Sequence, residues 1–127
     1  MRRALILFAH GARDPRWVAP FERLQKIIQL QQPDILVALA FLELMTPSLP
    51  DLVEQLVQDG CGEIDEIVVV PVFLGQGGHV LRDIPPLIEQ LNTKHPGLQL
   101  KLTPAVGEDL EVLNAIARYC VSSFLQS

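Results

Sequence analysis

The sequence lacks a long apolar run, and it is poor in net positive charge. Its longest unbroken apolar stretch is Ile67–Leu74, with Pro71 inside it, whereas a transmembrane helix needs about 20 such residues. The chain carries 15 acidic and 10 basic residues, for a formal net charge of −5. An acidic balance argues against nucleic-acid binding. We therefore expect neither a membrane nor a nucleic acid as partner.

Cysteine is also scarce, because the chain has only Cys61 and Cys120. Their wide separation fits neither a disulfide framework nor a zinc motif, and we expect both to be reduced. The apolar segment Ala4–Ala9 imitates a signal peptide, but it is shorter than the usual core of about 7–15 residues. We expect a cytoplasmic protein that forms a single domain over residues 1–127.

Strand and helix patterns alternate along the chain. Ala4–Ala9, Ile35–Leu42 and Ile67–Leu74 are almost continuously apolar, as strands covered on both faces of a parallel sheet must be. Leu98–Leu102 alternates leucine with polar residues and predicts a half-exposed edge strand. Helical patterns follow the four strands, beginning near Trp17, Leu49, Asp83 (as an N-cap) and Gly107.

Four such strand–helix units predict an α/β fold. Right-handed crossovers favour a doubly wound, three-layer α/β/α sandwich with a four-stranded parallel sheet, of which the simplest strand order is 2-1-3-4. In that order the first and third strands are neighbours and the chain reverses direction between them. Open parallel sheets bind ligands at this switch point, beyond the carboxyl ends of the strands.

Side chains with metal-binding chemistry follow three of the predicted strands. His10 follows the first, Glu43 the second and His79 the third. Imidazole is the commonest metal ligand, and two imidazoles with one carboxylate leave coordination positions open. The alternatives are that His10 caps a loop and that Glu43 is a strand-end charge facing water. His95 is expected to be a surface residue at a helix end, where a cation suits the helix dipole.

The segment Gly75-Gln76-Gly77-Gly78 lies between the third strand and its helix. Its backbone could cradle a phosphate or pass close to a flat ligand. It lacks both the ending of a P-loop and the spacing of a dinucleotide fingerprint, so by itself it identifies no ligand.

Arg13 and Arg82 flank the predicted site in the sequence. Each could bind a ligand carboxylate bidentately. Each could equally form a local salt bridge, with Asp14 or Asp83 as the obvious partner.

Several motifs together carry a resemblance to a known family. The segments are His10-Gly11-Ala12-Arg13-Asp14-Pro15, Phe41-Leu42-Glu43, Pro71-Val72-Phe73-Leu74, Gly78-His79-Val80, Asp83-Ile84-Pro85 and Pro104-Ala105-Val106-Gly107-Glu108. In combination they resemble the class II tetrapyrrole chelatases, most closely the small CbiX-type sirohydrochlorin cobaltochelatases. The two-domain siroheme ferrochelatase SirB is a related member. The resemblance covers nearly the whole chain.

The resemblance implies insertion of Co²⁺, or of Fe²⁺ or Ni²⁺, into sirohydrochlorin without ATP or an organic cofactor, on a route to cobalamin or siroheme. It implies that His10 and His79 are metal ligands and proton acceptors, with Glu43 as their acidic partner. The substrate-binding residues expected with them are Arg13, Phe41, Leu42, Gly75, Gln76, Gly77, Gly78 and Arg82. The family's usual serine after His-Gly is Ala12 here, which removes a hydroxyl beside the site.

Longer family members place the site between two similar domains, and this chain corresponds to one of them. The resemblance therefore implies a homodimer, which is also the commonest assembly on general grounds. Two other functions stay open from the residues alone. One is a tetrapyrrole or metal carrier with the same site and no turnover, and the other is a phosphate-ester enzyme that uses the glycine segment and His10.

Overall fold

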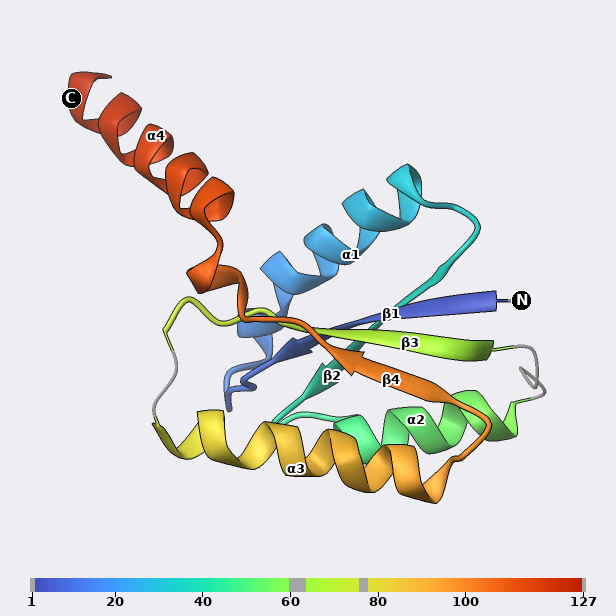
Figure 1. Cartoon of the computed structure of the whole chain (residues 1–127). Coiled ribbons are helices and arrows are strands. Elements are labelled where there is room, and N and C mark those ends of the chain that lie inside the picture. The colour runs from blue at the N-terminus through green and yellow to red at the C-terminus, as the bar shows by residue number, and fades with distance from the viewer. Residues whose placement is uncertain (1, 60–63, 76–77, 127) are drawn as a thin grey trace.

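A parallel sheet organises the molecule. The computed structural model describes residues 2–59, 64–75 and 78–126. Its strands are β1 (Arg2–Ala9), β2 (Leu36–Phe41), β3 (Ile64–Pro71) and β4 (Gln99–Leu102). They lie in the order β2-β1-β3-β4, and all neighbours are parallel (Figure 1). The predicted order is confirmed, and the chain changes direction between β1 and β3.

Helices lie on both faces of the sheet (Figure 1). On one face are α2 (Leu49–Gln58) and α3 (Gly78–Lys94), and on the other is α1 (Ala19–Gln31), which follows the 3-10 helix η1 (Pro15–Val18). The main core cluster fills the space between the sheet and the α2–α3 layer. Its members include Ile6, Phe8, Ile67, Val69, Val53, Leu52, Ile84, Ile88 and Leu91.

The end of the chain leaves this arrangement. After β4 come the short 3-10 helix η2 (Val106–Glu108) and α4 (Leu110–Gln126). In Figure 1, α4 points away from the sheet, and none of its side chains is buried. Within the described part of the chain, α4 and the other helices are too short or too polar to span a membrane. Cys120 on α4 is an exposed free thiol, and Cys61 falls outside the described residues.

The predicted helix starts are right for α2 and wrong for α3. Ser48 caps α2, and its hydroxyl accepts a hydrogen bond from the backbone N–H of Asp51. Asp83 was expected to cap α3, but α3 begins at Gly78 and holds Pro85 and Pro86 inside. Two prolines remove two backbone donors from a helix interior. Burial of Ile84 and its apolar neighbours against the sheet offsets that loss, because tertiary packing supplies most helical stability.

His95 is less exposed than its place at a helix end predicts. Its side chain is only 10% exposed, and its Nε2 lies 3.4 Å from Glu54 Oε2 of α2. Lys94 Nζ lies 3.5 Å from the same carboxylate oxygen. This group joins the middle of α2 to the carboxyl end of α3, away from the predicted site.

Glu66 links three strands on the face of the sheet that carries α1. Its carboxylate binds Arg3 Nε of β1 at 2.6 Å and Lys101 Nζ of β4 at 3.0 Å. Hydrogen bonds from Lys101 first, and then from Arg3, lower the pKa of the Glu66 carboxyl below its ordinary value. A lowered pKa in the folded state means that the charged form stabilises the fold.

We predict that Glu66→Gln lowers the free energy of unfolding at neutral pH but not in acid. The contribution of a carboxylate with a lowered folded pKa is present above its ordinary pKa, here 4.5, and is lost as the pH falls below that value. Chemical denaturation of both proteins at several pH values measures the difference. Glu89→Gln, an exposed change on α3, is the control. A difference that stays constant down to pH 3 contradicts the role assigned to Glu66.

Candidate metal site

His10 and Glu43 lie side by side at the carboxyl edge of the sheet. Backbone pairing continues past the ends of β1 and β2, because Leu42 N–H donates to Ala9 O (2.9 Å) and Glu43 N–H donates to His10 O (3.1 Å). The two side chains meet with His10 Nε2 3.5 Å from Glu43 Oε1. They are 49% and 58% exposed, so a ligand can reach both.

Gly11 allows this close approach. Its φ of +97° is in the left-handed region, and a Cβ at this position would collide with the carbonyl oxygen of Glu43. Any larger residue would therefore push the first loop away from the second. Glycine is the residue that tolerates both conditions.

The backbone beside Glu43 is strained. Leu44 has a φ of +66°, which costs a residue with a side chain roughly 1–2 kcal/mol. Met45 N–H donates to the carbonyl oxygen of Glu43 (2.8 Å) and Phe41 N–H donates to Pro47 O (2.9 Å), so the loop is held in this shape. Strain that surrounding bonds maintain is characteristic of ligand-binding segments.

Phe73 bounds the site on the side of β3. Its ring centroid lies 5.6 Å from that of His10, edge to face, and 6.1 Å from that of Phe8. Gly107 N–H donates to Phe73 O (3.0 Å), and a Cβ on Gly107 would collide with the carbonyl oxygen of Leu74. Helix η2 is thus packed directly against the segment that holds the Phe73 ring beside His10.

The separation of His10 Nε2 and Glu43 Oε1 suits a shared cation. Two ligands at about 2.1 Å from a tetrahedral metal ion are about 3.4 Å apart, and the two atoms are 3.5 Å apart. His79 falls in the first turn of α3, but its side chain is outside the described residues. Within the described part of the chain, no three His, Cys, Asp or Glu side chains gather as a metal site. The predicted triad therefore stays a prediction.

A pocket of about 560 Å³ opens between the loop after β2 and the start of α1. Apolar side chains line it together with two polar ones, Glu22 and Thr46, and the full set is Pro15, Val18, Glu22, Leu39, Phe41, Leu44, Met45, Thr46 and Pro47. Phe41 borders it although it is only 5% exposed. Leu42 instead packs against the core cluster. Phe41 and Leu42 were both predicted to bind substrate, and of these two only Phe41 lines the pocket.

Arg13 and its neighbour Asp14 do not pair. Asp14 caps η1 and binds Arg16, with Arg16 Nη2 2.6 Å from Asp14 Oδ2. The Arg16 side chain first, and then its backbone N–H, lower the pKa of the Asp14 carboxyl. Arg13 is exposed and makes no ion pair with any described residue, so the alternative of a local salt bridge between Arg13 and Asp14 is not realised.

The remaining predicted substrate residues surround the start of α3. Gly75 has open space around it, Gly78 is the first residue of α3, and Arg82 is exposed in the next turn. Gln76 and Gly77 lie outside the described residues. Sequence reasoning assigned no role in the site to Gly11, Gly107 or the Phe73 ring. A glycine two residues past the end of a strand was the available signal for Gly11.

Comparisons with known proteins agree with this fold. The CbiX family model matches residues 4–122. A sirohydrochlorin cobaltochelatase of Methanopyrus kandleri is 34% identical over 85 residues, which are 67% of this chain and 57% of that protein. The chain thus matches little more than half the length of that relative.

Two solved structures have the same fold. A CbiX protein from Marinobacter aquaeolei, assigned to cobalamin (vitamin B12) biosynthesis, superposes with a TM-score of 0.82 at 31% identity, over 98% of this chain and 99% of that one. The chelatase SirB of Bacillus subtilis, solved with cobalt, superposes with a TM-score of 0.77 at 24% identity, over 96% of this chain and 51% of SirB. The match of the family model to nearly the whole chain shows that this protein belongs to the CbiX family.

Proposed function

We propose that this protein inserts a divalent metal ion, Co²⁺ in the first place, into sirohydrochlorin without ATP. The observation that carries the proposal is the half-exposed pair of His10 and Glu43, 3.5 Å apart at the carboxyl edge of the sheet, in a chain of the CbiX family. Relatives named sirohydrochlorin cobaltochelatase support the substrate and the metal. Fe²⁺ and Ni²⁺ are alternative metal substrates, and the product feeds a route to cobalamin or siroheme.

The chemistry needs a loosely held metal ion and a nearby base. Insertion forms bonds from the ion to the pyrrole nitrogens, and two pyrrole N–H groups give up their protons. His10 can ligate through Nε2 while the Glu43 carboxylate shares the ion or accepts a proton. His79, which we propose as the second imidazole, completes a site that still leaves positions open for the macrocycle. The exposure of His10 and Glu43 lets the protons pass to water.

The macrocycle needs an apolar surface and partners for its carboxylates. The pocket beside Glu43 has an apolar wall that includes Phe41 and Leu44. Arg13 lies on the adjoining loop with its guanidinium exposed, where it can bind a carboxylate. We place the substrate across this edge, with Leu42, Arg82 and the glycine segment Gly75-Gln76-Gly77-Gly78 as further candidate contacts.

One such domain offers a single open edge to a large flat substrate. We therefore propose that the protein acts as a homodimer, in which a second copy closes the site. The match of this chain to 51% of SirB supports the comparison of one copy with half of a longer chelatase. No organic cofactor is part of the proposal.

The first prediction from the proposed function concerns insertion itself. Purified protein, sirohydrochlorin and Co²⁺, Fe²⁺ or Ni²⁺ are mixed in parallel, and the absorption change is compared with that of a metal-only blank. We expect acceleration that falls in acid, because metal binding to imidazole requires loss of a proton. His10→Ala should slow insertion by about 100-fold or more. His95→Gln, which changes a histidine at the carboxyl end of α3, should keep the rate.

Other outcomes of this assay have definite meanings. Tight macrocycle binding without repeated turnover would identify a carrier rather than an enzyme. Neither binding nor acceleration would reject the proposed function. A rate that stays normal in both His10→Ala and His79→Ala would remove the histidines from the mechanism.

The second prediction isolates the carboxylate. Glu43→Gln keeps the size of the side chain but removes its charge, so we expect Co²⁺ affinity to fall by roughly 10–100-fold. Calorimetric titration of Co²⁺ measures the change, with Glu89→Gln as the control for the loss of one acidic charge. Equal affinities in the two variants would show that Glu43 has no part in holding the ion.

The third prediction tests the close approach of the two loops. Gly11→Ala forces a Cβ into the Glu43 carbonyl at a positive φ, so we expect a loss of stability of about 2 kcal/mol or more together with weaker Co²⁺ binding. Gly97→Ala, where a Cβ meets open space, is the matched control. Thermal melts and metal titrations of both variants provide the comparison. Unchanged Co²⁺ affinity in a folded Gly11→Ala protein would contradict the role given to Gly11.

A further inference from the structure

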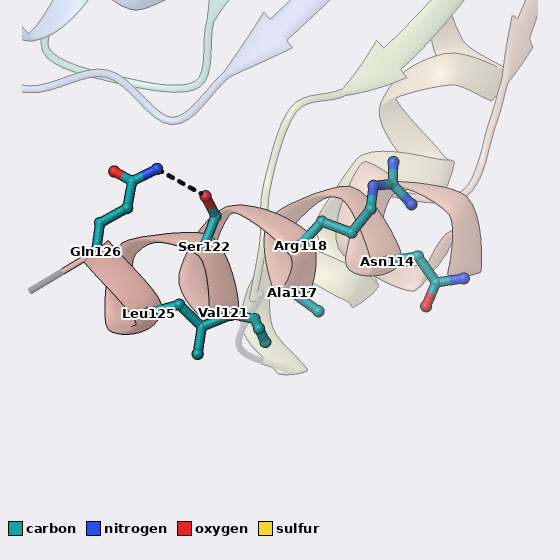
Figure 2. Close-up of a pocket in the computed structure, with 7 residues that line it drawn as sticks. All are labelled: Asn114, Ala117, Arg118, Val121, Ser122, Leu125 and Gln126. Atoms are coloured by element: carbon teal, nitrogen blue, oxygen red, sulfur yellow. Dashed lines mark hydrogen bonds between the residues drawn. The ribbon is translucent and has the colours of Figure 1, made fainter.

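Helix α4 carries a hollow whose described lining has no metal-binding side chain. Its volume is about 740 Å³, and Figure 2 shows that the residues around it all come from α4. Of these residues Arg118 is the charged one, and Ser122 and Gln126 bind each other through a hydrogen bond of 3.3 Å. Histidine, cysteine and carboxylate groups are not among them. Titratable side chains gather instead between α2 and α3.

Two buried side-chain atoms between α2 and α3 have no hydrogen-bond partner. They are Glu54 Oε2 and His95 Nε2, and within the described part of the chain no other buried side-chain nitrogen or oxygen is unsatisfied. The two atoms lie 3.4 Å apart, and the His95 side chain is only 10% exposed. Buried polar atoms are almost always hydrogen-bonded, so an unsatisfied one calls for an explanation such as a bound ion. Two such atoms side by side point to one shared ligand.

The chemistry and the spacing of this pair suit a transition-metal ion. An imidazole nitrogen and a carboxylate oxygen are both ligands of Zn²⁺, Co²⁺ and Ni²⁺. Two ligands at about 2.1 Å from a tetrahedral ion are about 3.4 Å apart, which matches the separation of His95 Nε2 and Glu54 Oε2. An ion between them would satisfy both atoms, and water molecules would complete its coordination.

Neighbouring groups hold both side chains in place. Glu54 Oε1 accepts a hydrogen bond from Gln58 Nε2, one turn further along α2 (3.3 Å), which orients the carboxylate and leaves Oε2 for another partner. The backbone N–H of His95 donates to Leu91 O (3.0 Å), and the carbonyl of His95 accepts from Leu98 N–H (3.0 Å). Supporting bonds of this kind orient the ligands of metal sites.

Lys94 competes with a cation for the Glu54 carboxylate. Its Nζ lies 3.5 Å from Glu54 Oε2, and its positive charge repels a metal ion. However, Lys94 is the last residue of α3 and its side chain is 68% exposed, so this ion pair is weak and easily broken. A divalent ion can therefore replace the ammonium group while the buried imidazole of His95 stays in place.

We propose that His95 and Glu54 form a second metal site, which takes a divalent ion of the zinc, cobalt or nickel type and joins α2 to α3. The site is separate from the pair of His10 and Glu43, and it does not rest on the proposed function. A bound ion stabilises the fold by mass action, because the unfolded chain does not hold the two ligands together. Since the His95 imidazole is buried, a macrocycle cannot reach an ion here, and the role of the site is structural.

The chain has three histidines, which makes the site measurable by NMR. His10→Ala/His79→Ala leaves His95 as the only histidine, so the imidazole signals of this double variant, prepared without an affinity tag, report on His95 alone. We expect Zn²⁺ to shift these signals with saturation at one ion per chain. Adding Glu54→Gln should weaken Zn²⁺ binding by roughly 10-fold or more. Adding Glu89→Gln, an exposed change on α3, controls for the loss of one negative charge and should leave binding intact.

Two further substitutions separate a metal site from a simple ion pair between His95 and Glu54. In the same double variant, Lys94→Gln removes the competing charge, so we expect Zn²⁺ affinity to rise by about 3-fold. Zn²⁺ should also raise the melting temperature of the double variant, and His95→Gln should abolish that rise. A simple ion pair predicts neither effect. If the double variant does not fold, the His95 signals of the wild type, identified by their loss in His95→Gln, give the same information.

The results that would overturn the proposal are definite. They are His95 signals that do not move with Zn²⁺, signals that move equally with and without the Glu54 carboxylate, and a lower Zn²⁺ affinity in Lys94→Gln. None of these results bears on metal insertion, because the double variant lacks both histidines proposed for that reaction. Zn²⁺ bound at His95 in a protein whose wild type inserts no metal would reject the proposed function and keep this site. Normal insertion by a wild type whose His95 ignores Zn²⁺ would do the reverse.

Discussion

The structure depends on the backbone pairing that continues past the ends of β1 and β2. Two hydrogen bonds, from Leu42 to Ala9 and from Glu43 to His10, set the distance between the two loops. Gly11 lets the loops close to that distance, because a Cβ would strike the Glu43 carbonyl. The imidazole and the carboxylate then face each other as a consequence of strand pairing, with no special contact needed to bring them together.

Strand β3 adds rigidity on the side of β1 that faces away from β2. Val72 N–H donates to Phe8 O (2.8 Å) beyond the end of β3, and the Phe73 ring borders His10. Gly107 packs η2 onto the same segment. A site built in this way is positioned mainly by backbone contacts, which persist when side chains move. The same η2 leads directly into α4.

Physical rules let the sequence predict the topology of the sheet and the closeness of two site residues, His10 and Glu43. Continuously apolar strands and right-handed crossovers leave few topologies, and the order β2-β1-β3-β4 follows. Neighbouring strand ends then bring His10 and Glu43 together. The start of α3 was not predictable from Pro85 and Pro86, because packing outweighs a local helix preference. The choice of Arg16 over Arg13 as partner of Asp14 depends on the exact turn at η1, which spacing alone does not specify.

The projection of α4 was also beyond local reasoning, because its apolar pattern would equally suit a helix packed on the core.

The central claim is that His10 and Glu43 hold the metal ion at the carboxyl edge of the sheet. Its most direct test is a crystal structure of the protein with Co²⁺, located by anomalous scattering at the cobalt absorption edge. We expect a cobalt peak within about 2.2 Å of both His10 Nε2 and Glu43 Oε1. Cobalt bound elsewhere, such as between His95 and Glu54, with an empty site at His10, would contradict the claim.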